Sequence, residues 1–204
     1  MSSVATLPVV ETFHSLQGEG HHSGRSAFFI RLAGCSVGCR WCDTKQSWPE
    51  GVHPLQSVDD LADAALAAVT GGACFTVITG GEPLHHDLGP LTTALGRTQR
   101  PLHLETSGVD PLSGQFDWIT LSPKRHRPPR TELLRRCHEL KVVVHSPEDL
   151  AFAEEMANQT DRQAELLLQP GWDSDRGREL SVAHVRHQPS WRLSLQTHKW
   201  LGVR

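Results

Sequence analysis

The stretch GCSVGCRWCD at residues 34–43 places three cysteines within eight residues, and an apolar run at 27–33 comes directly before it. The apolar run predicts a buried strand. Glycines at positions 34 and 38 favour a tightly curled loop, because glycine adopts positive φ without steric cost. We expect no export signal at the start of the sequence, and clustered thiols in an unexported protein indicate a metal or redox centre rather than disulfides.

Further strand-like runs follow this loop, and turns or helical patterns separate them. The runs lie at residues 74–79, 102–106, 118–121, 140–145, 165–169 and 192–197. Helices are expected at 61–69 after a Ser57 cap, from near 87, over 130–139, after 147 and, with a weaker pattern, over 177–187. This alternation predicts an α/β fold with a mainly parallel sheet, in a single domain over residues 1–204.

Composition and charge limit the classes of function. The net charge is −3 over 204 residues, which argues against broad nucleic-acid binding. No apolar run reaches the roughly 18 residues that a membrane span needs, since Asp63 interrupts the longest one. We therefore expect a soluble, cytoplasmic protein with no membrane or nucleic-acid partner.

Small, polar and charged residues follow the predicted strands at their carboxyl ends. They are the cysteine loop, GGEP at 80–83, ETSG at 105–108, SPK at 122–124, HS at 145–146, QPG at 169–171 and THK at 197–199. The carboxyl ends of parallel strands meet at one edge of a sheet or barrel, where ligands bind. The sequence therefore predicts a site at this edge.

The number of cysteines in the loop distinguishes two kinds of metal centre. A structural zinc site needs four ligands, so His53 or a distant residue would have to complete it. A [4Fe–4S] cluster on three thiolates keeps one iron open. An open iron can bind S-adenosylmethionine (SAM) and deliver the electron that splits it into a 5′-deoxyadenosyl radical. We favour such a cluster on Cys35, Cys39 and Cys42, with zinc as the alternative.

The motifs resemble a known family. CSVGCRWC at 35–42 is similar to the CxxxCxxC signature of the radical SAM superfamily, and ITGGEP at 78–83 to its glycine-rich motif. More specifically, the sequence resembles the 7-carboxy-7-deazaguanine synthase family over most of its length. The segments that carry this resemblance are ETFHSLQGEG at 11–20, FIRLAGC at 29–35, CDT at 42–44, Thr79, ETSG at 105–108 and SPK at 122–124.

The resemblance implies a reaction and its requirements. The reaction is the conversion of 6-carboxy-5,6,7,8-tetrahydropterin to 7-carboxy-7-deazaguanine with loss of ammonia, a carbon–nitrogen lyase step in the biosynthesis of queuosine and other 7-deazapurines. The implied fold is a shortened radical SAM core, an incomplete TIM-like barrel of mainly parallel strands. The implied cofactors are a [4Fe–4S] cluster, SAM and Mg²⁺. The implied partners are a second copy in a homodimer and a reducing electron donor such as flavodoxin or ferredoxin.

The resemblance also assigns roles to the residues at matching positions. Cys35, Cys39 and Cys42 would hold the cluster, and Thr44 would hold Mg²⁺. The SAM contacts would be Trp41, Asp43, Gly80, Gly81, Glu82, Ser107, Ser122, Pro123, Lys124 and Gln169. The substrate contacts would be Leu16, Gln17, Gly18, Glu19, Arg31, Thr79 and Arg204, the last through its main-chain carboxylate. Apart from the resemblance, the position of His198 near the C-terminus makes it a further candidate substrate contact. No catalytic acid or base is assigned, because the radical itself abstracts the hydrogen atom.

Two other functions stay open from the residues alone. One is a glycyl-radical enzyme activase, whose members usually carry a Gly-Pro-Gly-type sequence where this chain has QGEG at 17–20. The other is a non-catalytic binding module stabilised by zinc.

Several single features have simpler interpretations. Arg31 could pair with a buried carboxylate. The basic run at 124–127 is expected to be a solvated face. Cys74 and Cys137 are expected in the core.

Overall fold

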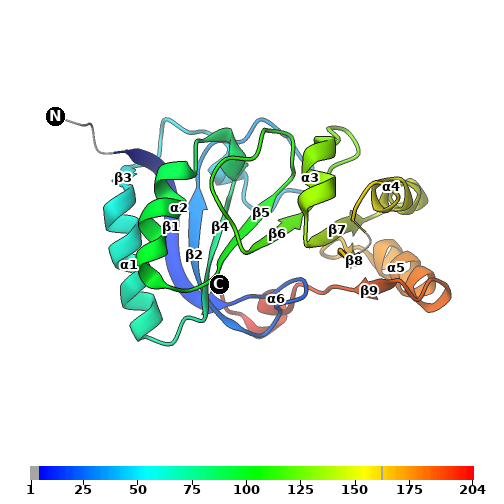
Figure 1. Ribbon diagram of the computed structural model, residues 1–204. Coiled ribbons are helices and arrows are strands. Elements are labelled where there is room, and N and C mark those ends of the chain that lie inside the picture. The colour runs from blue at the N-terminus through cyan, green and yellow to red at the C-terminus, as the bar shows by residue number, and fades with distance from the viewer. Residues whose placement is uncertain (1–4, 162) are drawn as a thin grey trace.

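The structure, a computed structural model, describes residues 5–161 and 163–204, which form a nine-stranded sheet of order β3-β1-β2-β4-β5-β6-β7-β8-β9 (Figure 1). The strands are β1 (Thr6–Leu16), β2 (Ser26–Leu32), β3 (Leu55–Ser57), β4 (Phe75–Gly80), β5 (Leu102–Thr106), β6 (Trp118–Leu121), β7 (Glu139–Val144), β8 (Glu165–Pro170) and β9 (Trp191–Leu193). Neighbouring strands from β2 to β9 are parallel, and β1 is antiparallel to both β2 and β3. The predicted α/β fold with a mainly parallel sheet is confirmed.

The helices alternate with the strands as expected. They are α1 (Val58–Thr70), α2 (Gly89–Leu95), α3 (Thr131–Arg136), α4 (Pro147–Ala157), α5 (Asp175–His187) and α6 (Thr197–Leu201), with short 3₁₀ turns η1 (Lys45–Ser47), η2 (Pro83–His85) and η3 (Gly96–Thr98). Helix α1 starts at the predicted cap, because the Ser57 side chain accepts a hydrogen bond of 3.0 Å from the Asp60 amide. No helix in the described part of the chain is long and apolar enough to cross a membrane.

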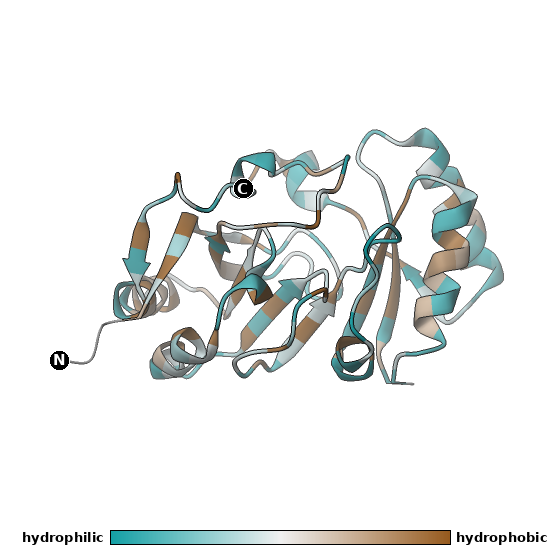
Figure 2. Ribbon diagram, turned by 90° about the horizontal axis from the view of Figure 1, so that it is seen from above, coloured by the Kyte–Doolittle hydropathy of each residue, from teal (hydrophilic) through white to brown (hydrophobic). Residues whose placement is uncertain are grey.

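The main core lies between the helices and one face of the sheet. Ile30, Ile78 and Leu104 from the strands are fully buried there, together with Leu61 of α1 and Leu91 of α2. Figure 2 shows α6 and the C-terminal residues on the other side of the curved sheet. Alternate strand residues point to that side, so charged and polar residues in the strands are kept away from the helix-covered core.

The loop between β1 and β2, residues 17–25, crosses this second face of the sheet. The Gly20 amide donates to Oγ of Ser194 at 3.0 Å, and the His21 amide donates to Oε2 of Glu139 at 2.7 Å. The loop therefore connects the first strands of the sheet with β7 and the segment after β9.

Some predicted elements differ from the structure. Strands β1 and β3 were not expected. Helix α3 ends at Arg136 rather than at Glu139, because Cys137 is extended (φ −70°, ψ 143°) and Glu139 begins β7. The strand expected at 192–197 covers only Trp191–Leu193, since the Thr197 amide donates to the carbonyl of Gly18 at 2.8 Å.

The two isolated cysteines have different environments. Cys137 is buried, as expected. The expectation for Cys74 is wrong, because its side chain is exposed directly before β4.

Candidate active site

A cavity of about 720 Å³ lies at the carboxyl ends of the parallel strands. Its walls bring together residues that are distant in the sequence. This agrees with the prediction that residues following the carboxyl ends of the strands form one site. The predicted site residues among them are Leu16, Gln17, Gly18, Glu19, Arg31, Cys35, Cys39, Trp41, Cys42, Asp43, Thr44, Thr79, Gly80, Gly81, Ser107, Ser122, Lys124, Gln169, His198 and Arg204. The two predicted residues that do not line the cavity are Glu82 and Pro123.

The cysteine loop follows β2 and is held by backbone contacts. Gly34 and Gly38 have φ of 97° and 72°, the left-handed values that the sequence predicted for glycine. The Gly34 amide donates to the carbonyl of Ser47 at 2.8 Å. Gly81, at the end of β4, packs so closely that a Cβ atom there would lie 2.8 Å from Cβ of Cys35. Only glycine fits this approach of the two loops.

All three thiols of the loop line the cavity and none forms a disulfide. Burial raises the pKa of the Cys35 and Cys39 thiols. Lys124 also lines the cavity, and burial lowers the pKa of its ammonium group while the Cys39 thiolate opposes that change. Within the described residues, no three His, Cys, Asp or Glu side chains form a group that could hold a single metal ion. A [4Fe–4S] cluster has a different requirement, since each of its three thiolates binds a different iron.

Glu82 connects the ends of β4 and β5 behind the cavity wall. Its carboxylate accepts hydrogen bonds from Oγ1 of Thr106 at 2.5 Å, from the Ser107 amide at 2.8 Å and from Oγ of Ser107. The Leu84 amide adds a fourth at 3.1 Å. Glu82 is 1% exposed, so the structure places it where it fixes the loops that carry Gly81 and Ser107.

A group of hydrogen-bonding side chains lies on the wall formed by β4 and β5. Glu105 accepts from Nε2 of Gln17 at 2.9 Å and from Oγ1 of Thr79 at 3.1 Å. Glu105 was not among the predicted site residues, although the ETSG motif contains it. Its place at the carboxyl end of β5 is the signal that it belongs to the site, because this end of a parallel strand is where ligands bind.

Glu19 and Lys141 form an ion pair in the depth of the cavity. Oε1 of Glu19 also accepts from Nε2 of Gln196 at 2.8 Å. Burial alone would raise the pKa of Glu19, but the Lys141 ammonium lowers it to about 2. Burial alone would lower the pKa of the Lys141 ammonium group. The carboxylates of Glu19, Glu105 and Glu139 outweigh burial and raise this pKa. Lys141 therefore stays protonated at neutral pH and neutralises carboxylates. Lys141 was not predicted as a site residue, although a lysine at the start of the apolar run KVVV is a visible signal.

His145 is a third cavity residue whose role was not predicted from the sequence. It lines the cavity at the end of β7, with its ring centroid 5.1 Å from that of Trp41. Its Nε2 atom is buried and finds no hydrogen-bond partner among the described residues. Its ring packs against Gly171, where an added Cβ atom would lie 2.6 Å from Nε2.

Arg31 has the carboxylate partner that its place in an apolar strand suggested. Its Nε atom lies 3.0 Å from Oε1 of Glu11, and Nη2 of Arg204 lies 2.8 Å from Oε2 of the same carboxylate. Oγ of Ser15 donates to the main-chain oxygen of Arg204 at 2.5 Å. Both guanidinium groups lie 5.7 Å from the ring centroid of Phe13. Arg31 therefore forms an ion pair and also lines the cavity.

The C-terminal segment contacts two predicted binding loops. The Thr197 amide and Oγ1 donate to the carbonyl of Gly18 at 2.8 and 3.0 Å. His198 packs directly on Gly18, where a Cβ atom would collide with its ring. Nζ of Lys199 lies 2.7 Å from Oδ2 of Asp43. Residues 16–20 and the cysteine loop are therefore joined through α6.

The basic run at 124–127 is not a purely solvated face, which corrects the expectation. Arg127 donates to Oγ of Ser36 at 3.0 Å and to the carbonyl of the same residue. Nε2 of His126 lies 3.0 Å from the carbonyl oxygen of Val37. The run therefore packs against the outside of the cysteine loop.

Comparison with known proteins identifies the family. No family model matches the chain. It is 54% identical to 7-carboxy-7-deazaguanine synthase of Prochlorococcus marinus, over 97% of this chain and 98% of that protein. It is 51% identical to the synthase of Synechocystis sp. (98% and 94% covered) and 37% identical to that of Escherichia coli (96% and 98% covered). The chain belongs to the 7-carboxy-7-deazaguanine synthase family.

A solved structure agrees with this assignment. The crystal structure of QueE from Escherichia coli superposes with a TM-score of 0.82 at 35% identity and covers 95% of both chains. Membership in the 7-carboxy-7-deazaguanine synthase family confirms the predicted radical SAM enzyme and lyase, and the superposition agrees with the predicted partial barrel.

Proposed function

We propose that this enzyme converts 6-carboxy-5,6,7,8-tetrahydropterin to 7-carboxy-7-deazaguanine with loss of ammonia, within a single domain. The proposal rests on one observation: the three thiols and a group of polar side chains that could bind a substrate line the same cavity. The three thiols line one part of its wall, and Gln17, Thr79, Glu105 and Arg31 line another. A radical formed beside the thiols would therefore be close to a molecule bound at the second set.

Cys35, Cys39 and Cys42 fit a [4Fe–4S] cluster, since three thiols on one loop face a common cavity and two curled glycines allow the loop to surround it. When bound, the cluster would supply the electron that cleaves SAM. Trp41, Asp43, Gly80, Gly81, Ser107, Ser122, Lys124 and Gln169 would surround SAM, and Glu82 and Pro123 would shape that wall from behind.

The second residue set fits a pterin acid. Glu105 and Gln17 offer the paired acceptors and donors that an amide and amidine edge needs. The carboxylate of the substrate needs a cation, and Arg31 or Mg²⁺ would provide it. Oγ1 of Thr44 lies 3.2 Å from Oδ1 of Asp43, so oxygen ligands that Mg²⁺ prefers are present beside the cysteine loop. Leu16, Gly18, Glu19, His198 and the main chain of Arg204 would complete the contacts.

The proposal extends to assembly and location. We propose a homodimer in the cytoplasm that receives electrons from flavodoxin or ferredoxin. Support for an assembly comes from exposed apolar side chains beside the C-terminal segment. Trp172 and Trp200 are 45% and 78% exposed and form an edge-on pair with centroids 6.2 Å apart. Exposed aromatic clusters of this kind are typical of interaction surfaces.

An anaerobic turnover assay tests the proposed reaction. The enzyme is reconstituted with iron and sulfide, then mixed with SAM, dithionite, Mg²⁺ and the carboxytetrahydropterin. We expect 7-carboxy-7-deazaguanine and ammonia in equal amounts by mass spectrometry and ammonia assay. The Cys39→Ala variant should form neither. Absence of product from protein with confirmed iron and sulfide would reject the proposal, and zinc in place of iron would favour a binding module.

A further inference from the structure

Strand β1 contains a β-bulge directly before Glu11. Val9 lies opposite Leu32 of β2, and both side chains belong to the helix-covered core. Two residues further along β1, Glu11 lies opposite Arg31, so one residue of β1 is left without a partner in the register. A slip of one residue turns every following side chain to the other face of the sheet. Without the bulge, Glu11 would lie opposite Ile30 and enter the apolar core.

The bulge places Glu11 on the cavity side of the sheet. Phe13 and Phe29 form the next opposed pair on this side, and both line the cavity together with Arg31. Glu11 itself does not line the cavity. It can therefore act on a bound molecule only through the side chains that it holds.

The carboxylate of Glu11 holds Arg31 at one defined atom. Its Oε1 atom accepts from Nε of Arg31 at 3.0 Å. The two terminal nitrogens of this guanidinium form no hydrogen bond or ion pair with the described part of the chain. A guanidinium binds a carboxylate through two parallel N–H bonds. With Nε occupied, the pair of terminal nitrogens is the one that stays available for such a contact.

The charges around Glu11 favour one further anion. Its Oε2 atom lies 2.8 Å from Nη2 of Arg204, so a single carboxylate is shared by two guanidinium groups. Both groups lie 5.7 Å from the ring centroid of Phe13, where the face of an aromatic ring attracts cations. One positive charge is left over at the wall of the cavity. This charge matches one carboxylate of a bound molecule.

We propose that Glu11 is a positioning residue that presents the terminal nitrogens of Arg31 to the carboxylate of the pterin acid. This inference rests on the proposed function, which names that substrate. Holding a long side chain in its binding conformation lowers the entropy lost on binding. Glu11 therefore contributes to specificity, because only pterins that carry the carboxylate gain from a fixed Arg31.

The charge and the position of Glu11 have opposite effects on binding. Its negative charge repels the carboxylate of the substrate, so charge alone would make the loss of Glu11 strengthen binding. Positioning makes the same loss weaken binding. Two variants separate these effects. Glu11→Gln keeps an acceptor oxygen at the same reach without the charge, whereas Glu11→Asp keeps the charge but is one methylene shorter.

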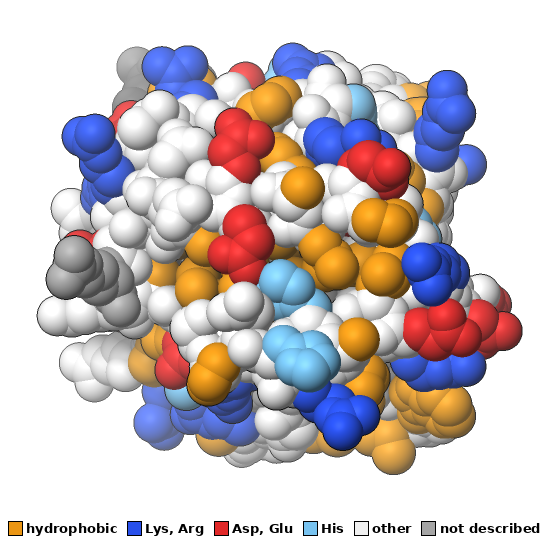
Figure 3. All heavy atoms as spheres, turned by 90° about the vertical axis from the view of Figure 1, so that its right-hand side faces the viewer, with side chains coloured by type: hydrophobic (Ala, Val, Ile, Leu, Met, Phe, Trp, Pro, Cys, Tyr) orange, Lys and Arg blue, Asp and Glu red, His pale blue; other side chains and the backbone are white. Residues whose placement is uncertain are grey.

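The test measures the binding of two pterins to enzyme reconstituted without air, in the presence of SAM and Mg²⁺. The first is 6-carboxypterin, an oxidised fluorescent analogue of the substrate, and the second is pterin, which lacks the carboxylate. Fluorescence quenching gives the dissociation constant of each. Glu179→Ala is the matched control, since it removes a carboxylate that pairs with Arg176 on α5. Charges of both signs are interspersed on the outer face formed by α4 and α5 (Figure 3).

We expect the dissociation constant of 6-carboxypterin to rise about tenfold in Glu11→Ala and in Glu11→Asp, as for the loss of one charge-assisted hydrogen bond. Glu11→Gln should bind it at least as tightly as the unchanged enzyme. Pterin should bind equally to all these proteins, and the Glu179→Ala control should match the unchanged enzyme with both compounds. In turnover, KM should rise in Glu11→Asp with little change in kcat, because substrate and transition state lose the same contact.

Three results would overturn the inference. The first is weak binding of 6-carboxypterin by Glu11→Gln but not by Glu11→Asp, which would make the charge decisive. The second is an equal loss of affinity for pterin, which would make Glu11 a purely structural residue. The third is unchanged binding in every Glu11 variant. The Gln and Asp variants decide the question even where Glu11→Ala fails to fold. An unchanged enzyme that binds neither compound would reject the substrate of the proposed function itself, and this inference with it.

Discussion

Nζ of Lys199, in α6, lies 2.7 Å from Oδ2 of Asp43, the residue that directly follows the last cysteine of the loop. The same ammonium group lies 5.0 Å from the ring centroid of Trp172, which follows β8. This one side chain therefore joins three segments that are distant in the sequence. Burial of Asp43 would raise the pKa of its carboxyl group, but the hydrogen bond from Lys199 lowers it. The cysteine loop is thus held from the C-terminal side as well as by its own backbone.

Replacing Lys199 by methionine should loosen the cysteine loop on the side where SAM is proposed to bind. Because Asp43 is 58% exposed, the pair stabilises by no more than about 1 kcal/mol. We expect the dissociation constant of SAM to rise about threefold, measured by calorimetry on reconstituted protein. Lys199→Arg keeps the charge and should restore most of the affinity. Equal affinity in all three proteins would contradict the proposed link.

Breaking the Glu19–Lys141 pair should destabilise the whole fold. Lys141 has a side-chain exposure of 5% and is surrounded by Glu19, Glu105 and Glu139. The Lys141→Met variant leaves buried carboxylates without their cation, and the expected loss is about 3–5 kcal/mol. Urea denaturation followed by circular dichroism measures it.

The matched variant Lys141→Met with Glu19→Gln removes both charges of the pair. It should recover part of the lost stability, because the uncompensated carboxylate is gone. Substrate binding should stay weak in both variants, since the loop at 16–20 loses its anchor. A double variant less stable than Lys141→Met would contradict this account.

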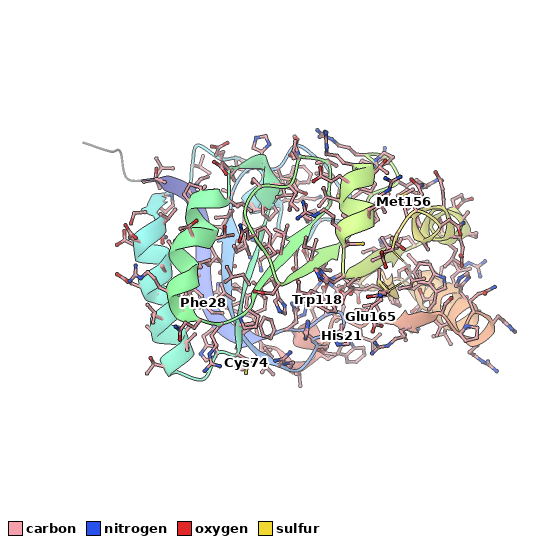
Figure 4. All side chains as sticks on the ribbon, in the orientation of Figure 1. His21, Phe28, Cys74, Trp118, Met156 and Glu165 are labelled. Carbon is pink, nitrogen blue, oxygen red and sulfur yellow. The ribbon has the colours of Figure 1, made fainter. Side chains whose placement is uncertain are left out.

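His103 should make the fold sensitive to acid. Its ring stacks on Phe75 at 4.1 Å, in a cluster with His22 and Trp118 at the opposite end of the strands from the cysteines. Figure 4 shows Trp118 and His21 side by side at this end, with ring centroids 5.0 Å apart. Burial lowers the pKa of His103 from 6.5 to about 3, with repulsion from His22 adding to it.

The sign of the effect follows from proton counting. Between pH 3 and 6.5 the unfolded chain binds the His103 proton more readily than the folded one, so stability is complete above pH 6.5 and falls as the pH drops through that window. The slope from one such group is at most about 1.4 kcal/mol per pH unit. His103→Phe keeps the stack and should flatten the pH dependence of urea stability, whereas His187→Gln should not. An unchanged slope in His103→Phe would contradict the prediction.

Adding one methyl group at Gly81 should disturb the cluster site. The new Cβ would meet Cβ of Cys35 at 2.8 Å and the carbonyl of Gly34, so the cysteine loop must move. Overpacking of this kind costs about 1–3 kcal/mol. We expect Gly81→Ala to bind several-fold less iron and sulfide after reconstitution. Gly96→Ala, with no atom within 4 Å of the new methyl group, should bind the normal amount.

Local patterns predicted the parts of the fold whose causes are local. The Ser57 cap, the apolar runs of the parallel strands and the glycines at 34 and 38 act within a few residues, and all three appear in the structure. Strand β1 was missed because many of its residues are half-buried and give a weak alternation. Lys141 was missed because its partner Glu19 is 122 positions away. The role of a charged residue in a strand can be recognised only when the fold brings its oppositely charged partner close to it.

The loop at 17–25 is fastened by Glu139, Ser194 and Thr197, which are all made much later in synthesis. Contacts over such sequence separations form slowly and add entropy cost to folding. A nascent chain that has reached β6 already contains β2, β4 and the cysteine loop between them, but it lacks the later residues that hold both the cysteine loop and the loop at 17–25. Both parts of the proposed site would thus be completed only after the C-terminal segment has been synthesised.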